Sequence, residues 1–248
     1  MAEKSILVIL GSGLYDLYKN ERSKLLSLTT KYGPASVAEI KRAGSTRFLV
    51  MLRHGEDHAL PPHLINYRAN IQAAKDLGVD YIIASASVGA INPKLSVGQY
   101  VIVDQFLDFT RRRESTFYME SGAQFSHTDM THPYSDRVRR ALINAAKKYG
   151  DKLSLSGTYA CTEGPRFETP AEIRMFRLLG GDVVGMTGVP EVVLANEAAI
   201  EYGTLAQVTN MAAGLQKKIT QSEVGEIMKK SLMKTRKIID AAAEGLAK

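Results

Sequence analysis

The chain has 248 residues, of which 45% are hydrophobic and 23% charged, a balance typical of one large α/β domain with a sizeable core. Cys161 is the only cysteine, which excludes an intrachain disulfide, favours a cytoplasmic location and predicts a small buried hydrophobe. The formal net charge is +6, but the basic runs at 111–113 and 229–237 are not interleaved with base-stacking aromatic residues. The apolar runs are too short to cross a membrane. We therefore predict neither a nucleic-acid partner nor a membrane partner.

Short apolar runs alternate with helical periods along the chain. The predicted strands are, in chain order, 6–10, 47–51, 81–85, 100–104, 154–160, 182–185 and 204–208. The predicted helices are 64–77, 135–149, 170–179, 190–202 and 222–246. This order predicts a single α/β domain, residues 1–248, with a mixed, mostly parallel central sheet flanked by helices and a long C-terminal helix. Residues 39–51 differ from the rest, because they resemble an antiparallel hairpin.

Glycines and polar residues follow the first three strands of this predicted parallel set. In open sheets of this kind, ligands bind beyond the carboxyl ends of the strands. Gly11-Ser12-Gly13 offers close backbone approach and a hydroxyl, Arg53-His54 a planar cationic fork and a ring nitrogen, and Ala86-Ser87 amides and a second hydroxyl. The first joint has another interpretation as a tight turn, and the second as a surface charge cluster or as a histidine metal site without further ligands. Together, three such joints predict one shared phosphate site.

The segment 157–191 concentrates polar residues at the junctions between its predicted strands and helices. Thr169 and Glu172 form a capping box with a proline at the first helical position, so we assign both to structure. Glu168 lies just outside that helix and is free to face a pocket. Met186-Thr187 ends a strand before a second helix that begins with proline. This segment therefore predicts the other half of a small-molecule site.

Taken together, these residues resemble the trimeric purine nucleoside phosphorylase and methylthioadenosine phosphorylase family. The resemblance covers residues 6–214 in register. It rests on five motifs, which are specific jointly and not singly: Gly11-Ser12-Gly13, Arg53-His54-Gly55, Asn66-Tyr67-Arg68-Ala69-Asn70, Glu163-Gly164-Pro165-Arg166-Phe167 and Met186-Thr187-Gly188-Val189-Pro190-Glu191. The second and third motifs are closer to the methylthioadenosine branch.

The resemblance implies phosphorolysis with no cofactor and no metal, in which a nucleoside and inorganic phosphate give a free purine and a sugar 1-phosphate. It implies a phosphate site made by Ser12, Arg53, His54, Ala86, Ser87 and Thr187. Met186 would contact the ribose, and Phe167 would stack near the base. His127 would come from a neighbouring subunit and close the site near the 5′ end of the sugar, which implies a homotrimer or a dimer of trimers.

The base site departs from the methylthioadenosine branch, which has a serine and an aspartate where this chain has Glu168 and Asn210. A carboxylate accepts the N1–H of a 6-oxopurine, whereas adenine has no N1–H, and Asn210 can donate to O6 or N7. An unmatched buried polar group costs about 1–3 kcal/mol. The sequence thus predicts a preference for inosine, guanosine and 5′-methylthioinosine. In a looser alignment with the family, Gln221 occupies the position that contacts the 5′ group of the nucleoside.

The predicted catalytic residues are Asn210, Glu168, Arg53 and His54, because charge builds up on both the sugar and the departing base in the transition state. The alternatives are a 5′-methylthioadenosine phosphorylase, a nucleoside hydrolase on the same scaffold and a non-catalytic binding module. A nucleotide-dependent dehydrogenase is disfavoured, because the third glycine of the dinucleotide fingerprint is missing.

Overall fold

The computed structural model describes the chain except for residues 1–2, 43–45, 56–57, 120–123, 150–151 and 218–219 and the side chain of Gln221. The strands are β1 (Ser5–Leu10), β2 (Ser23–Thr30), β3 (Gly33–Ile40), β4 (Arg47–Leu52), β5 (Tyr81–Ala90), β6 (Tyr100–Ile102), β7 (Gln105–Phe109), β8 (Leu153–Ser154), β9 (Thr158–Thr162), β10 (Val183–Gly185) and β11 (Glu201–Met211). The α-helices are α1 (Tyr67–Asp76), α2 (Asp136–Tyr149), α3 (Pro170–Leu178), α4 (Gly188–Glu197) and α5 (Gln221–Leu246). Two short 3-10 helices, η1 (Tyr15–Tyr18) and η3 (Pro62–Leu64), lie in the connections.

The described strands form one 11-stranded sheet whose main path runs β2-β3-β4-β1-β5-β10-β9-β7. β11 pairs with β5 along the other edge of that strand, and β6 and β8 continue the sheet from β11. Six of these pairings are parallel and four antiparallel. The prediction of a mixed, mostly parallel sheet is confirmed.

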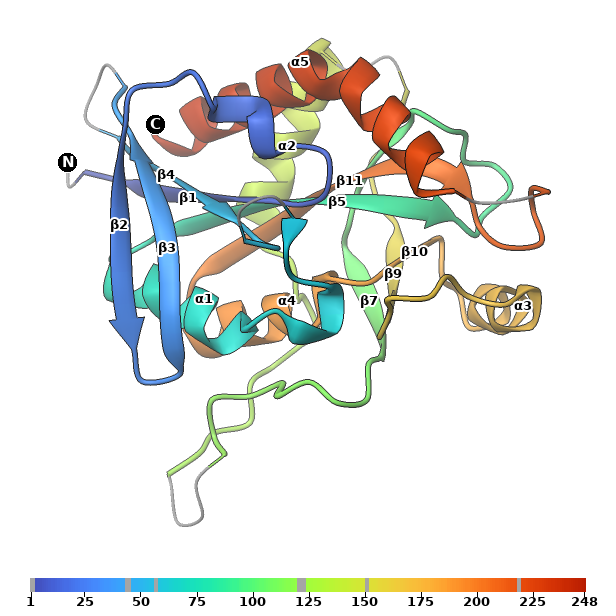
Figure 1. Ribbon diagram of the computed structural model, residues 1–248, viewed down its shortest axis with the longest axis horizontal. Helices are drawn as coiled ribbons and strands as arrows, with labels where there is room; N and C mark the ends of the chain where they lie inside the picture. Colours follow the sequence, from blue (N-terminus) through green and yellow to red (C-terminus); the bar gives the residue numbers. More distant parts are fainter. Residues whose placement is uncertain (1–2, 43–45, 56–57, 120–123, 150–151, 218–219) are drawn as a thin grey trace.

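Helices cover both faces of the sheet. In Figure 1, α2 and α5 lie above it and α1 and α4 below it. The upper core packs Val138 and Leu142 of α2 and Ile238 and Ile239 of α5 against alternate residues of β1 and β5. The lower core packs residues of α1 and α4 against the opposite face of the same strands. Because β1 is buried on both faces, its sequence is a continuous apolar run, as expected for a central parallel strand.

Several predicted boundaries differ from those of the structure. The hairpin at 39–51 is part of an antiparallel pair, β3 with β4, but β3 also pairs with β2, which the sequence analysis did not predict. The predicted strand 154–160 is two strands, β8 and β9, with Gly157 between them. The predicted helix 190–202 ends at Glu197, since Ala199 has a positive φ of 57° and β11 begins at Glu201. β7 was not predicted, and η3 occupies the start of the predicted helix 64–77.

The most consequential difference concerns β5, which was predicted to end at Ser85 and instead continues to Ala90. Its edge opposite β11 pairs with β1 only as far as Ala84, and pairing with β10 begins at Gly89. Among the described strands, residues 85–88 therefore have no neighbour on that edge. Ala86 and Ser87 lie in this gap and not in a loop after the strand. The gap is the position of the site described below.

Candidate active site

A cavity of about 410 Å³ opens at the gap in the edge of β5. It is lined by the ends of β1, β4, β10 and β11, by the loop before α3 and by the first turn of α5. Ten of the residues singled out from the sequence line it: Ser12, Arg53, His54, Ala86, Ser87, Phe167, Glu168, Met186, Thr187 and Asn210. The rule that ligands bind beyond the carboxyl ends of strands therefore points to this cavity.

One end of the cavity is rich in hydroxyls. Ser12 follows β1, Ser87 lies in β5, and Thr187 precedes α4 without using its side chain to cap that helix. The Ser87 hydroxyl donates to the Ser12 carbonyl at 3.3 Å, which ties the first loop to β5. Three hydroxyls, which can each rotate to donate, form a suitable environment for an oxyanion.

Arg53 is held at the back of this end by bonds to other parts of the protein. Its Nε and Nη2 donate to the two oxygens of Glu191, both at 2.7 Å, and its Nη1 donates to the Ser85 carbonyl at 2.8 Å. Tyr202 donates its hydroxyl to the same carboxylate at 2.8 Å. Arg53 is 2% exposed and Glu191 0% exposed. Since a guanidinium has five N–H groups, two remain for a ligand.

Glu191 is the last polar residue of the segment 157–191, which the sequence predicts to supply half of a small-molecule site, and the structure corrects this for Glu191. The carboxylate is fully buried and is occupied by Arg53 and Tyr202. Burial lowers the pKa of the Arg53 guanidinium, but the charge and the hydrogen bonds of Glu191, together with nearby tyrosines, raise it above its ordinary value. Glu191 therefore fixes the orientation of Arg53 and does not line the cavity.

His54 adjoins Arg53 and also lines the cavity. Its Nδ1 lies 2.9 Å from the carbonyl of Leu60, and the Leu60 N–H donates to the His54 carbonyl at the same distance. Burial and the neighbouring Arg53 charge lower the pKa of the imidazole to about 4. The ring is therefore neutral at physiological pH.

His58 reaches the same end of the cavity, although the sequence analysis did not assign it a role. Its Nε2 lies 2.8 Å from Ser12 Oγ, and its ring centroid is 4.2 Å from that of His54. Its backbone has a positive φ of 58°, which is uncommon for a residue other than glycine. The short spacing from Arg53-His54 was the only signal, and a surface charge cluster explained it equally well.

Glu168 and Asn210 also line the cavity, and the part that they line is called its acid–amide end below. Glu168 is 8% exposed, and one carboxylate oxygen accepts from the Thr162 hydroxyl at 2.7 Å. Burial raises the pKa of this carboxyl, and the Thr162 bond opposes that shift. Thr169, the next residue, caps α3, and Glu172 completes the capping box, so the predicted capping box is confirmed. The capped helix start thus fixes where Glu168 points.

Asn210 faces the same end from β11. The register of β11 against β5 shifts between Val208 and Asn210. The amide accepts from the Thr209 hydroxyl at 2.9 Å and donates to the Met211 carbonyl at 3.0 Å, which leaves one N–H and one lone pair. A Cβ at Gly89 would lie 3.0 Å from the amide nitrogen, so the glycine provides the room that Asn210 occupies.

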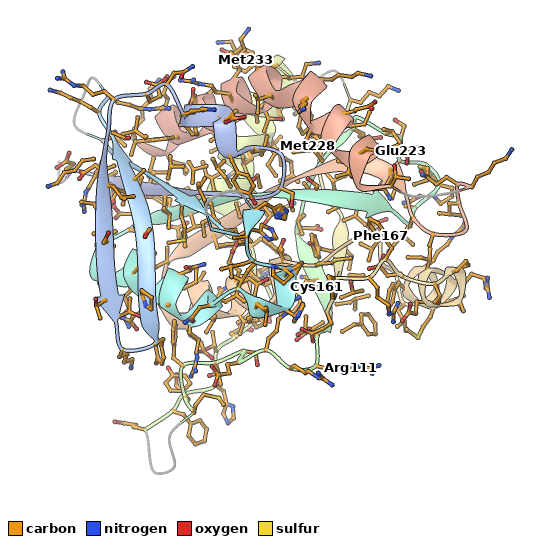
Figure 2. The ribbon with its side chains drawn as sticks, in the orientation of Figure 1. Arg111, Cys161, Phe167, Glu223, Met228 and Met233 are labelled. Atoms are coloured by element: carbon orange, nitrogen blue, oxygen red, sulfur yellow. The ribbon has the colours of Figure 1, made fainter. Side chains whose placement is uncertain are left out.

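Apolar groups form the remaining walls. Phe167 is 43% exposed at the rim, and Met186 lines the wall between the two polar ends. Val224, in the first turn of α5, closes the cavity from above. Gly13, with φ at 79°, lets the first loop contact Met228 of α5, because a Cβ there would lie 2.6 Å from the Met228 Cβ. Figure 2 shows Phe167 and Glu223, near the start of α5, on the same side of the molecule.

The arrangement of an oxyanion end, an apolar middle and an acid–amide end agrees with the comparison with known proteins. Residues 5–244 match the family described as the phosphorylase superfamily. The chain belongs to this superfamily. The resemblance inferred from the sequence is confirmed, and so is the prediction of an enzyme of this class.

Two relatives and one solved structure illustrate what this phosphorylase-superfamily chain is similar to. It is 47% identical over 243 residues to the 6-oxopurine nucleoside phosphorylase of Pyrococcus furiosus, covering 96% of this chain and 91% of that protein. It is 44% identical over 241 residues to a Methanothermobacter thermautotrophicus protein named "Probable S-methyl-5'-thioinosine phosphorylase", covering 96% and 83%. A methylthioadenosine phosphorylase from Schistosoma mansoni in complex with adenine superposes with a TM-score of 0.89, at 30% identity, covering 98% and 91%. These matches confirm the fold class.

Of the predicted ribose-binding residues, His127 does not line the cavity. His127 is exposed on the segment between β7 and α2, which extends away from the sheet in Figure 1, and its ring meets Phe125 edge-on. A role in a neighbouring subunit stays a prediction. The side chain of Gln221 lies outside the described residues. Val224, one turn further along α5, is the residue of this helix that lines the cavity.

Cys161 is buried and has both a donor and an acceptor in the backbone of Val189. Burial raises the pKa of its thiol to about 12, so the prediction of an unreactive packed residue agrees with the structure. Among the described residues, no group of three or more His, Cys, Asp or Glu side chains is placed to hold a metal ion. The described helices include none long and apolar enough to span a bilayer.

Proposed function

We propose that this protein cleaves the glycosidic bond of purine nucleosides with inorganic phosphate, prefers 6-oxopurines, and releases a free purine and a ribose 1-phosphate. The observation that carries the proposal is the pairing within one cavity of a hydroxyl-rich end, backed by Arg53, with a buried acid–amide pair, Glu168 and Asn210. The relative named 6-oxopurine nucleoside phosphorylase supports the base preference.

In this proposal phosphate binds among Ser12, Arg53, His54, Ala86, Ser87 and Thr187. The two free N–H groups of Arg53 and the three hydroxyls hold it against the sugar face. The attack builds positive charge on the sugar, which the bound anion stabilises. Since Arg53 is already fixed by Glu191 and Ser85, its donors need no reorganisation when the charge develops.

The purine lies between Phe167 and the walls of the cavity, with its six-membered ring toward Glu168. An ionised Glu168 accepts the N1–H of hypoxanthine or guanine, and the free N–H of Asn210 donates to O6 or N7 as negative charge develops on the leaving base. Adenine would present a lone pair to the carboxylate and an amino group to the amide N–H. Both mismatches fall on buried groups, so each costs about 1–3 kcal/mol.

The ribose in this proposal contacts Met186, and its 5′ group lies toward Gln221 and toward His127 of a neighbouring copy. That placement requires an oligomer, which we propose to be a homotrimer or a dimer of trimers. Relatives named for methylthioinosine and methylthioadenosine leave the 5′ substituent open between hydroxyl and methylthio. One domain over residues 1–248, a cytoplasmic location, and activity without cofactor or metal complete the proposal.

The test is turnover of inosine, guanosine, adenosine, methylthioadenosine and methylthioinosine by the purified protein, with and without phosphate. We expect cleavage of the 6-oxopurine substrates only when phosphate is present. Equal turnover of inosine and methylthioadenosine would contradict the base preference and favour the methylthioadenosine phosphorylase alternative. Cleavage without phosphate would identify a nucleoside hydrolase instead.

A further inference from the structure

The protonation pattern of His54 is fixed by its surroundings. A carbonyl oxygen only accepts, so the 2.9 Å contact between Nδ1 and Leu60 requires the proton on Nδ1. The return bond from the Leu60 N–H to the His54 carbonyl closes the loop and holds the ring in this orientation. The second nitrogen, Nε2, of the neutral ring is then a lone pair. Among the described residues, no hydrogen bond to Nε2 is formed.

Among the described residues, the main charges that act on His54 do not favour a second proton on its ring. They belong to Arg53, His58 and Arg113, and each lowers the pKa of the imidazole. Arg53 is itself compensated by Glu191 within a buried bidentate pair. The oxyanion end of the cavity therefore combines a neutralised guanidinium, several hydroxyls and one ring nitrogen that accepts. A ligand that lacks a proton would meet that lone pair with an oxygen lone pair.

We propose that this anion site selects a protonated tetrahedral oxyanion, in which a P–O–H group donates to Nε2 of His54 while the other oxygens accept from Arg53 and the hydroxyls. The inference rests on the proposed function and specifies the state in which phosphate binds. Phosphate and arsenate carry a proton at neutral pH and fit this site. Sulfate has the same shape and charge as the phosphate dianion but no proton, so it is disfavoured.

The discrimination has a defined dependence on pH. At about pH 8 the His54 ring is neutral and sulfate has no donor for Nε2, so the penalty for sulfate is complete. As the pH falls toward the pKa of His54, the ring takes up a proton and can donate to sulfate. Binding of the anion itself favours this protonation. The difference in affinity between phosphate and sulfate should therefore begin to decrease at a pH above the pKa that His54 has in the protein without ligand.

The experiment is calorimetric titration of the purified protein with phosphate, arsenate and sulfate at constant ionic strength, from about pH 5 to about pH 8. We expect phosphate and arsenate to bind alike, and sulfate to bind roughly 10- to 100-fold more weakly at the upper end, since an unmatched buried acceptor has a cost of that order. Because free phosphate itself gains a proton over this range, the pH dependence is read from sulfate, whose charge stays constant: sulfate should bind more tightly as the pH falls toward the pKa of His54. Equal binding of sulfate and phosphate at the upper end, sulfate binding that is independent of pH, or binding of neither anion would overturn the inference.

Two variants separate the role of Nε2 from general anion binding. His54→Gln places an amide, which can turn either a donor or an acceptor to the ligand, near the position of Nε2, and should reduce the phosphate-to-sulfate ratio about tenfold. Ser12→Ala removes a donor that serves both anions and should weaken both while leaving the ratio unchanged. A reduced ratio in Ser12→Ala and not in His54→Gln would contradict the assignment.

The same preparations distinguish this inference from the proposed function. Phosphate-dependent cleavage of inosine tests the function, whereas the anion ratio is measured without any nucleoside. Normal cleavage with equal binding of sulfate and phosphate would reject only the protonated-oxyanion site. Loss of phosphate dependence with the expected anion ratio would reject only the phosphorylase function.

Discussion

The two ends of the cavity are built differently. At the oxyanion end, Arg53 is 2% exposed, and three of its five N–H groups are used by Glu191 and Ser85 before any ligand arrives. At the acid–amide end, which is the base end in the proposed function, Glu168 accepts one side-chain hydrogen bond, from Thr162, and Phe167 beside it is 43% exposed at the rim. The first end is fixed by the fold, whereas the second keeps free donors and acceptors. In the proposed function, the reaction chemistry common to all purines therefore lies at the rigid end, and selection among purines at the open end.

The two ends of the cavity should also differ in how much they contribute to the stability of the fold. Taking two charges out of water costs several kcal/mol each, and a buried pair offsets that cost only with good geometry and further hydrogen bonds. The pair of Arg53 and Glu191 has both, through its bidentate contact and the Tyr202 hydroxyl. Changes at the oxyanion end should therefore affect both folding and catalysis, while changes at the base end should affect the choice of substrate.

The largest effect is expected from Arg53→Lys. A lysine presents a single point charge that cannot span both oxygens of Glu191 and the Ser85 carbonyl, so buried acceptors are left unpaired. We expect unfolding to become easier by about 3–5 kcal/mol and phosphorolysis of every nucleoside to fall together. Denaturant unfolding measures the first effect, and kcat/KM for phosphate measures the second. Unchanged stability would show that the pair is not the rigid element described above.

A smaller effect is expected from Glu168→Gln. The amide oxygen still accepts from N1–H, but a neutral acceptor is weaker than a carboxylate, and the amide can turn its N–H toward adenine. We expect kcat/KM for inosine to fall about 10- to 100-fold, with little change for adenosine, and the unfolding midpoint to stay within a few degrees. An equal loss on both nucleosides would mean that Glu168 does not read the base.

Asn210→Asp should shift selectivity in the same direction by a smaller factor. An aspartate loses the donor to O6 but gains an acceptor for the 6-amino group, so the ratio of inosine to adenosine cleavage should fall about tenfold. The bond from Thr209 is retained, since that hydroxyl donates to the side-chain oxygen. The measurement is the ratio of kcat/KM values at fixed phosphate. An unchanged ratio would place the discrimination on Glu168 alone.

The sequence predicted most of the sheet but not its edge hairpin. β2 is largely exposed and lacks a continuous apolar run, and β3 contains Pro34 and alternates weakly, so neither has the pattern of a buried strand. Their pairing is a tertiary outcome, because β3 also adds to the edge of β4. The extension of β5 to Ala90 was missed because the small residues 86–90 resemble a loop when the strands beside them are unknown.

In the site, as in the sheet, features with a local sequence pattern could be predicted and features that depend on long-range contacts could not. Residues directly after predicted strands, such as Ser12, Arg53 and Thr187, could be predicted because parallel strands end at one edge of a sheet. His58 and Val224 reach the cavity through a loop reversal and through the return of the C-terminal helix over the first loop. The structural role of Glu191 depends on a contact with Arg53, 138 residues away. Neither kind of long-range contact has a local signal in one sequence.

The smallest effect, and the matched control for the base end, is Thr169→Ala. Thr169 adjoins Glu168 but caps α3: its hydroxyl accepts from the Glu172 N–H at 3.2 Å, and Glu172 returns a bond to the Thr169 N–H at 2.7 Å. Loss of the hydroxyl should lower the free energy of unfolding by about 1 kcal/mol and leave the ratio of inosine to adenosine cleavage unchanged. Denaturant unfolding and paired kinetics measure both quantities. If the ratio moved as far as in Glu168→Gln, selectivity would depend on the placement of the loop before α3 and not on the carboxylate itself.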